Sequence, residues 1–194
     1  MATADLSSPM MLLAMPQVLD PFFHHSVVLL VHHEKEGSFG FILNRPTGIR
    51  VSEILQGMEV TWQGQERAVA YFGGPVQPSL GTVLYDPRSE DPEASGTVVL
   101  PGISLTQHVG DLAELATDPP ERFRLFLGYA GWGEGQLVQE ILRNDWLTAP
   151  VQSDLIFAPD PEQVWMAGLR SVGVDPAALP SWTAPSGGGE ETTN

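Results

Sequence analysis

The segment from Arg124 to Arg143 constrains the fold of this chain more than any other part of the sequence, and we call it the signature segment. It opens with an apolar run, passes four glycines at positions 128, 131, 133 and 135, and ends with helical periodicity. An apolar run favours a buried strand, and closely spaced glycines favour a loop. The sequence therefore predicts a strand over 123–127, a glycine-rich loop, and a helix over 136–143.

Strands and helices interleave along the rest of the chain, with Pro and Gly turns between them. This mixture predicts an α+β fold, namely a single compact domain with a mixed, largely antiparallel β-sheet and helices packed against it. The expected limits are a flexible N-terminus at 1–9, the domain at 10–175 and a disordered acidic tail at 176–194. We expect strands at 12–15, 26–32, 38–43, 68–72, 82–85, 97–100, 146–147 and 155–157, a strand break at 44–48, and helices at 51–56, 105–115 and 161–172, the last capped by Asp160.

The composition excludes several classes of function. The chain has no cysteine, so a disulfide framework, a zinc–thiolate site and a thiol nucleophile are all ruled out. Nine basic residues against 24 acidic ones give a net charge of −15, which makes direct nucleic-acid binding unfavourable. No segment approaches the roughly 18 apolar residues that a membrane span needs. We expect a cytoplasmic protein without a cofactor, a metal ion or a membrane partner.

Four blocks of sequence carry a resemblance to a known family. They include Asp20-Pro21, the Asn44-Arg45-Pro46 turn, the Gly73-Gly74-Pro75 turn and the run Gly128-Tyr-Ala-Gly-Trp132, with Glu140 and Trp146 following. In content and order the chain resembles the YqgE/AlgH family of bacterial proteins. The resemblance implies a compact α/β-type domain and a cytosolic location. It also implies a function that is poorly established, with the label of transcriptional regulator on some members.

The glycines of the signature segment allow two interpretations. A strand, a glycine loop and a helix N-terminus together can form an anion site. However, no Gly-Lys-Ser/Thr follows, Gln136 replaces the third glycine of a dinucleotide motif, and Glu134 places negative charge in the loop. We favour the structural interpretation, in which the glycines permit positive φ and close packing around Tyr129 and Trp132.

The polar candidates also allow two interpretations each. On the helix over 136–143, one side should face the core and carries Leu137, Val138, Ile141 and Leu142. The other side carries Gln136, Glu140 and Arg143. Glu140 is therefore a polar anchor, a recognition residue or part of a solvated Glu–Arg face. Arg45 can bind a carboxylate or phosphate, or it can fix the turn with Asn44 and Pro46. Four histidines, at 24, 25, 32 and 33, lie in two separated pairs without metal-ligand spacing.

The leading hypothesis is a non-enzymatic cytosolic regulatory or adaptor protein with a protein or small-molecule partner. The alternative is an enzyme of unrecognised type, with a pocket near Arg45 and Glu140. Because the three groups of candidates all follow strand ends, we expect them to meet in space. The candidate ligand or partner site comprises Asn44, Arg45, Gly73, Gly74, Pro75, Gly128, Tyr129, Trp132, Gln136 and Glu140.

Overall fold

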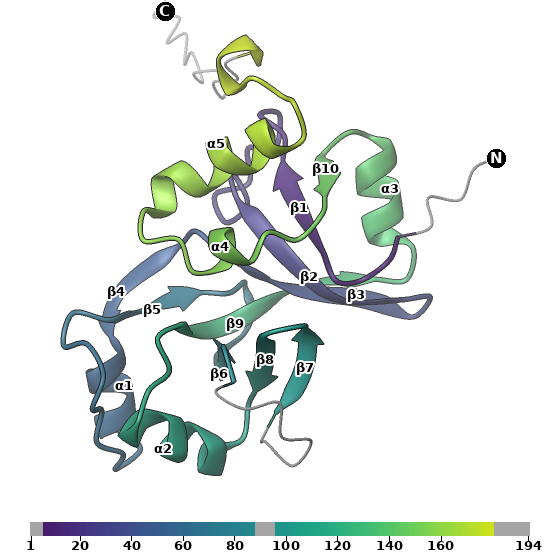
Figure 1. Cartoon of the computed structure of the whole chain (residues 1–194). Coiled ribbons are helices and arrows are strands. Elements are labelled where there is room, and N and C mark those ends of the chain that lie inside the picture. Colours follow the sequence, from purple (N-terminus) through teal and green to yellow (C-terminus); the bar gives the residue numbers. More distant parts are fainter. Residues whose placement is uncertain (1–5, 88–95, 181–194) are drawn as a thin grey trace, which may run out of the picture.

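The structure is a computed structural model that describes residues 6–87 and 96–180. A ten-stranded sheet curls into a half-barrel, in the order β10-β1-β2-β3-β9-β6-β8-β7, with β5 pairing with β9 and β4 with β5 (Figure 1). The β5–β9 pair is parallel and the other pairs are antiparallel, which confirms a mixed, largely antiparallel sheet. The strands are β1 (Met10–Ala14), β2 (Val27–Glu34), β3 (Gly37–Ile42), β4 (Pro46–Arg50), β5 (Val69–Phe72), β6 (Val76–Tyr85), β7 (Thr97–Leu100), β8 (Ile103–Thr106), β9 (Phe123–Gly133) and β10 (Trp146–Ala149).

Strand β9 lies at the centre of the sheet, and its length shows that the predicted glycine-rich loop after residue 127 was wrong. The strand does not stop at residue 127 but continues to Gly133, because β3 pairs with its second half and β5 and β6 with its first. Gly128, Gly131 and Gly133 therefore lie in a paired strand. Only Glu134 and Gly135 form a turn before the next helix.

Five α-helices cover the sheet in the described part of the chain: α1 (Val51–Gln56), α2 (Val109–Thr117), α3 (Gln136–Leu142), α4 (Ser153–Ile156) and α5 (Pro161–Ser171). Helices α4 and α5 lie over β1 and β2, whereas α1 and α2 lie at the opposite end of the sheet (Figure 1). Helix α5 begins as predicted, since the Asp160 side chain accepts a hydrogen bond from the backbone N–H of Glu162. None of the helices in the described residues is long and apolar enough to cross a membrane.

Three apolar clusters hold these layers together. One lies under α5 around Leu29, Phe41 and Phe126, and the Trp165 indole there donates to the carbonyl of Ala14 at 2.7 Å. A second joins α1 and α2 to β5, β6 and β9 through Leu55, Leu112, Val83 and Leu125. The third packs α3 against β1, β2 and β9 through Leu137, Trp132, Trp146 and Leu12.

Several local predictions were wrong. Residues 155–157 do not form a strand, because α4 spans Ser153–Ile156, and a short apolar run has no period that separates helix from strand. The predicted break at 44–48 contains the start of β4 at Pro46. The helix expected from Leu105 begins at Val109, because Ile103–Thr106 pairs with β6 and β7.

The predicted termini fall partly outside the described residues, which begin at Leu6 and end at Pro180. Leu6 packs against the cluster around Trp132. The tail was expected from residue 176, but Pro176–Ala178 form a short 3-10 helix and Leu179 packs against the main core. Ordered structure therefore continues beyond the predicted boundary at 175.

Candidate functional site

The turn between β9 and α3 sets the geometry of the signature segment. Gly135 has a left-handed backbone with φ of 68°, which a residue with a side chain rarely adopts, and it forms the N-cap of α3. The Gln136 side-chain oxygen reaches back and accepts a hydrogen bond from the backbone N–H of Gly133 at 3.0 Å. The first turn of α3 is thereby fixed to the end of the strand.

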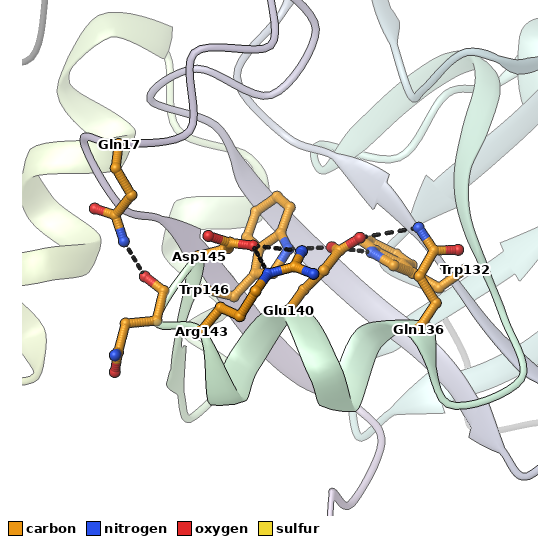
Figure 2. A network of polar contacts seen from close by, with 8 residues as sticks. Gln17, Trp132, Gln136, Glu140, Arg143, Asp145 and Trp146 are labelled. Carbon is orange, nitrogen blue, oxygen red and sulfur yellow. Dashed lines mark hydrogen bonds and ion pairs between the residues drawn. The ribbon is translucent and has the colours of Figure 1, made fainter.

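Glu140 is the centre of a polar network on this helix (Figure 2). Its Oε2 accepts hydrogen bonds from the indole N–H groups of Trp132 and Trp146, both at 2.8 Å, and its Oε1 accepts one from Gln136 at 2.9 Å. The two indole rings are perpendicular, with centroids 5.9 Å apart. A carboxylate only accepts hydrogen bonds, so it suits three converging donors. Glu140 is thus the polar anchor that joins β9, α3 and β10.

Arg143 lies on the same side of α3 as Gln136 and Glu140, but its charge is paired with Asp145. Its guanidinium forms two hydrogen bonds with one carboxylate oxygen of Asp145, at 2.8 and 3.1 Å. The helix also differs from the predicted amphipathic pattern, because Leu142 is 69% exposed although Leu137 is buried. A seven-residue helix presents only a narrow buried stripe, and Leu142 lies off it.

A cavity of about 430 Å³ opens beside this network, and we call it the α3 pocket. Its polar side chains already have partners within the protein: Gln17 donates to the Asn144 carbonyl, and Asp20 accepts from the backbone N–H groups of Phe22 and Phe23. The pocket is therefore preformed. Its walls are Gln17, Val18, Leu19, Asp20, Phe23, Gly131, Trp132, Gln136, Glu140, Arg143, Asp145 and Trp146.

The glycines at the β5–β6 corner allow the backbone of this corner to lie in close contact with the backbone of β9. A Cβ at Gly73 would lie 2.3 Å from the carbonyl oxygen of Gly128, and one at Gly74 would lie 2.1 Å from the carbonyl carbon of Tyr129. Gly128 itself has φ of 68°, and its own Cβ would meet the Gly74 oxygen at 2.4 Å. These three glycines let the β5–β6 corner lie directly on β9. The neighbouring Pro75 is exposed.

Asn44 and Arg45 tie two loops together. The buried Asn44 side chain accepts from the backbone N–H of Val27 at 3.0 Å and donates to the carbonyl of His25 at 2.9 Å. Arg45 donates to the carbonyls of Asn44 and His24. Partial burial lowers the pKa of the Arg45 guanidinium from its ordinary value. Arg45 also lines a cavity of about 670 Å³ with His24, His25 and Trp165.

The predicted meeting of the strand ends is confirmed. Phe72 donates to the carbonyl of Arg45 at 2.7 Å, and Gly73 donates to the carbonyl of Leu127 at 2.8 Å. The signature network around Glu140, however, opens into the α3 pocket, whereas Arg45 lines the cavity beside Trp165. The ten candidate residues thus form one continuous structural unit with two separate openings. Tyr129 lines neither and instead packs edge-on against Phe39.

The sequence reasoning missed Arg124, which is only 8% exposed. Its guanidinium donates to the carbonyls of Leu43, Ile156 and Ala158 and lies 4.0 Å from the centre of the Tyr71 ring. The signal was present, because a lone charged residue in an otherwise apolar strand must have a partner or a role. Asp145 and Gln17 carried no such signal.

Comparison with known proteins agrees with this geometry. The family model described as AlgH-like matches residues 11–177. The chain belongs to the AlgH-like family. No specific function is established for this family, and the resemblance inferred from the four blocks is confirmed.

Relatives and solved structures cover nearly the whole chain. UPF0301 proteins of Myxococcus xanthus and Cupriavidus metallidurans are each 39% identical, over 89% and 87% of this chain and 94% and 89% of their own lengths. The solution structure of the AlgH protein from Pseudomonas aeruginosa matches with a TM-score of 0.72 at 31% identity, over 93% of this chain and 99% of that one. A crystal structure from Corynebacterium diphtheriae matches with a TM-score of 0.72 at 25% identity, over 88% and 89%. Both solved structures therefore share the fold of this chain.

Proposed function

We propose that the chain is a non-enzymatic cytosolic regulatory or adaptor protein that binds a protein partner at the α3 pocket. The observation that carries this proposal is the state of Glu140. The side chains of Trp132, Trp146 and Gln136 take three of the roughly four acceptor positions of its carboxylate. A carboxylate held by three donors is poorly placed to turn toward a substrate and exchange a proton with it. Such an anchored carboxylate suits a rigid recognition surface.

The rim of the pocket supplies the features that protein partners use. Leu19 lines the pocket and is 40% exposed, and Phe22 in the same loop is 45% exposed and stacks on Phe72. Exposed apolar side chains beside a preformed cavity are typical of interaction sites. Asp20 and Glu140 also leave the pocket with an excess of negative charge, since Arg143 is paired with Asp145. The favoured partner presents an apolar side chain flanked by basic residues.

The enzyme alternative receives less support. It requires Arg45 and Glu140 near one pocket, and they line different cavities. The regulator label on some relatives does not require DNA contact, because a regulator can act through another protein. A net charge of −15 opposes approach to the phosphate backbone. We therefore place any regulatory role at the level of protein binding.

The test is capture of partners from the native cytosol, followed by mass spectrometry, with matched variants of the chain. Leu19→Ser and Phe22→Ser remove the exposed apolar rim, and Val98→Ser removes an apolar side chain that is 71% exposed on the distant strand β7. We expect the rim variants to lose a protein that the parent and Val98→Ser retain. Circular dichroism verifies that all variants are folded. Equal recovery of every protein by all four chains would refute the proposed surface.

A further inference from the structure

A second cavity, of about 680 Å³, lies between the loop that joins α1 to β5, the start of β9 and the segment after α4. It is separate from the α3 pocket and shares no lining residue with it. We propose that this cleft binds a small aromatic phosphate of the size of a mononucleotide. The proposal goes beyond the adaptor function, because it concerns a different part of the surface and a different class of ligand.

The cleft concentrates positive charge in an acidic protein. Three of the eight arginines, Arg67, Arg122 and Arg124, line it, against the two carboxylates of Asp118 and Glu121. In a chain with a net charge of −15, a cleft where arginines are as numerous as the neighbouring carboxylates is unusual. Arginines on the wall of a cleft attract anionic ligands.

Arg124 gives the cleft a buried cation without a counter-ion. Its three acceptors in the described residues are neutral backbone carbonyls, and its fourth partner is the face of the Tyr71 ring. Within the described residues no carboxylate forms an ion pair with it. Burial lowers the pKa of this guanidinium from its ordinary value, yet an arginine retains its charge. A buried charge is normally paired, so an uncompensated one at a cavity wall favours an anionic ligand.

Arg67 adds a cation at the mouth of the cleft. Its side chain is exposed, and the described residues provide it with no ion-pair partner. Arg122 is already paired with Asp154 at 3.0 Å, so it contributes less net charge. Guanidinium groups are the preferred partners of phosphate, because their planar N–H groups match two phosphate oxygens at once. Arg67 and Arg124 thus provide one exposed and one buried cation for the same anion.

Part of the cleft wall is aromatic, and this part selects the rest of the ligand. Trp62 and Phe123 both line the cavity, with ring centroids 4.9 Å apart. The Trp62 indole N–H donates to the carbonyl of Gln65 at 2.9 Å, and this contact fixes the ring. Rigid aromatic walls hold a flat ring by stacking. The cavity volume lies within the range of small-ligand sites, about 300–1,000 Å³.

The experiment titrates the full chain with adenosine 5′-monophosphate, adenosine and ribose 5-phosphate by calorimetry, and locates each by amide NMR shifts. We expect saturable binding of the monophosphate, with shifts at residues 62–69 and 118–125. Adenosine and ribose 5-phosphate each lack half of the recognised chemistry, so each should bind at least about tenfold more weakly. Absence of saturable monophosphate binding overturns the proposal, as does ribose 5-phosphate binding equally well.

Variants separate the cleft from general charge. Arg67→Gln should weaken monophosphate binding by about tenfold or more, and Arg170→Gln, which removes an exposed charge on α5, should leave it unchanged. Trp62→Leu should weaken binding of the monophosphate and leave ribose 5-phosphate unaffected. Equal effects of Arg67→Gln and Arg170→Gln would overturn the site. The rim variants Leu19→Ser and Phe22→Ser should bind the monophosphate like the parent, so failure here and failure of the adaptor proposal are distinguishable.

Discussion

Replacing Glu140 by leucine removes the one acceptor that two buried indole N–H groups share. Trp132 and Trp146 are only 6% and 4% exposed, and both donate to Oε2 of Glu140. Leucine fills part of the same volume but accepts no hydrogen bond. The change therefore isolates the polar contribution of Glu140 from its packing.

The expected loss follows from the two orphaned donors. A buried donor without an acceptor costs about 1–3 kcal/mol, so two cost about 2–6 kcal/mol. A domain of this size is stable by about 5–15 kcal/mol, so the loss is a large part of the total. Gln136 loses its bond to Glu140 as well, but it is exposed and water can replace that acceptor.

Glu140→Gln is the matched control. Its amide oxygen can still accept from both indoles, so neither Trp132 nor Trp146 is orphaned. Its amide N–H₂ then faces the donor of Gln136, which cannot turn over without giving up the hydrogen bond from Gly133. We expect a loss of about 1–1.5 kcal/mol from this one contact and the missing charge.

Urea denaturation followed by circular dichroism measures both variants. Because the leucine variant keeps the fold, the midpoint should fall at an unchanged m-value, further for leucine than for glutamine. Near-ultraviolet circular dichroism should change most for leucine, since the perpendicular indole pair loses its common anchor. If the leucine and glutamine variants unfold at the same urea concentration, the shared indole acceptor is not what stabilises the fold; if both unfold like the parent, the network does not stabilise it at all.

Four further outcomes are expected. Trp132→Ala should lower the free energy of unfolding by about 3–5 kcal/mol, and Arg45→Ala should lower it by only about 1 kcal/mol. Urea denaturation measures both values. A Trp132→Ala variant as stable as the parent would place that ring outside the core. A fluorescence titration at physiological salt should detect no sub-micromolar binding to duplex DNA, because the net charge of −15 repels it, and tight sequence-specific binding would contradict this. Burial, then the charges of His24 and Arg45, lower the pKa of His25 from its ordinary 6.5, so as the pH falls the unfolded chain takes up this proton before the folded chain does. The melting temperature should therefore fall as the pH drops below about 6.5, and it should fall less steeply in His25→Asn. Identical pH profiles of the two chains would exclude His25 as the cause. Gly74→Ala should lower the melting temperature strongly, because its Cβ would lie 2.1 Å from the carbonyl carbon of Tyr129. Gly131→Ala should melt like the parent, since the nearest contact of its Cβ would be at 3.4 Å. Equal melting temperatures of the two variants would show that the β5–β6 corner can move away from β9 at little cost.

The sequence predicts most elements of this fold because their signals are local. The hairpin at 26–43 needs only two apolar runs and a turn, and α5 needs only Asp160 before Pro161. The long extent of β9 depends on non-local pairing instead. Glycines normally interrupt a strand, and only the partners on both sides of Gly128 to Gly133 hold this one in register.

The candidate site also combines residues that local sequence signals predict with residues that only the tertiary structure brings together. Trp132, Gln136 and Glu140 were predictable as a group from helical spacing and the family blocks, and the structure joins them in one network. The separation of Arg45 from Glu140 was not predictable, because it depends on how β4 and β10 pack at distant parts of the sheet. The walls contributed by Gln17 and Asp145 come from loops that have no pattern of their own.

The glycines of this chain fall into two kinds, and the difference bears on function. Gly73, Gly74 and Gly128 are fixed by the fold, since any side chain there would overlap backbone. Gly131 and Gly133 flank Trp132, yet a Cβ at either would meet nothing closer than 3.4 Å. The fold alone therefore does not require glycine at these two positions. Gly131 lines both the α3 pocket and the cavity beside Tyr129, and a side chain there would point toward Val76 and Tyr129 in the second of these. An alanine that leaves the melting temperature unchanged but weakens partner capture would assign Gly131 to recognition.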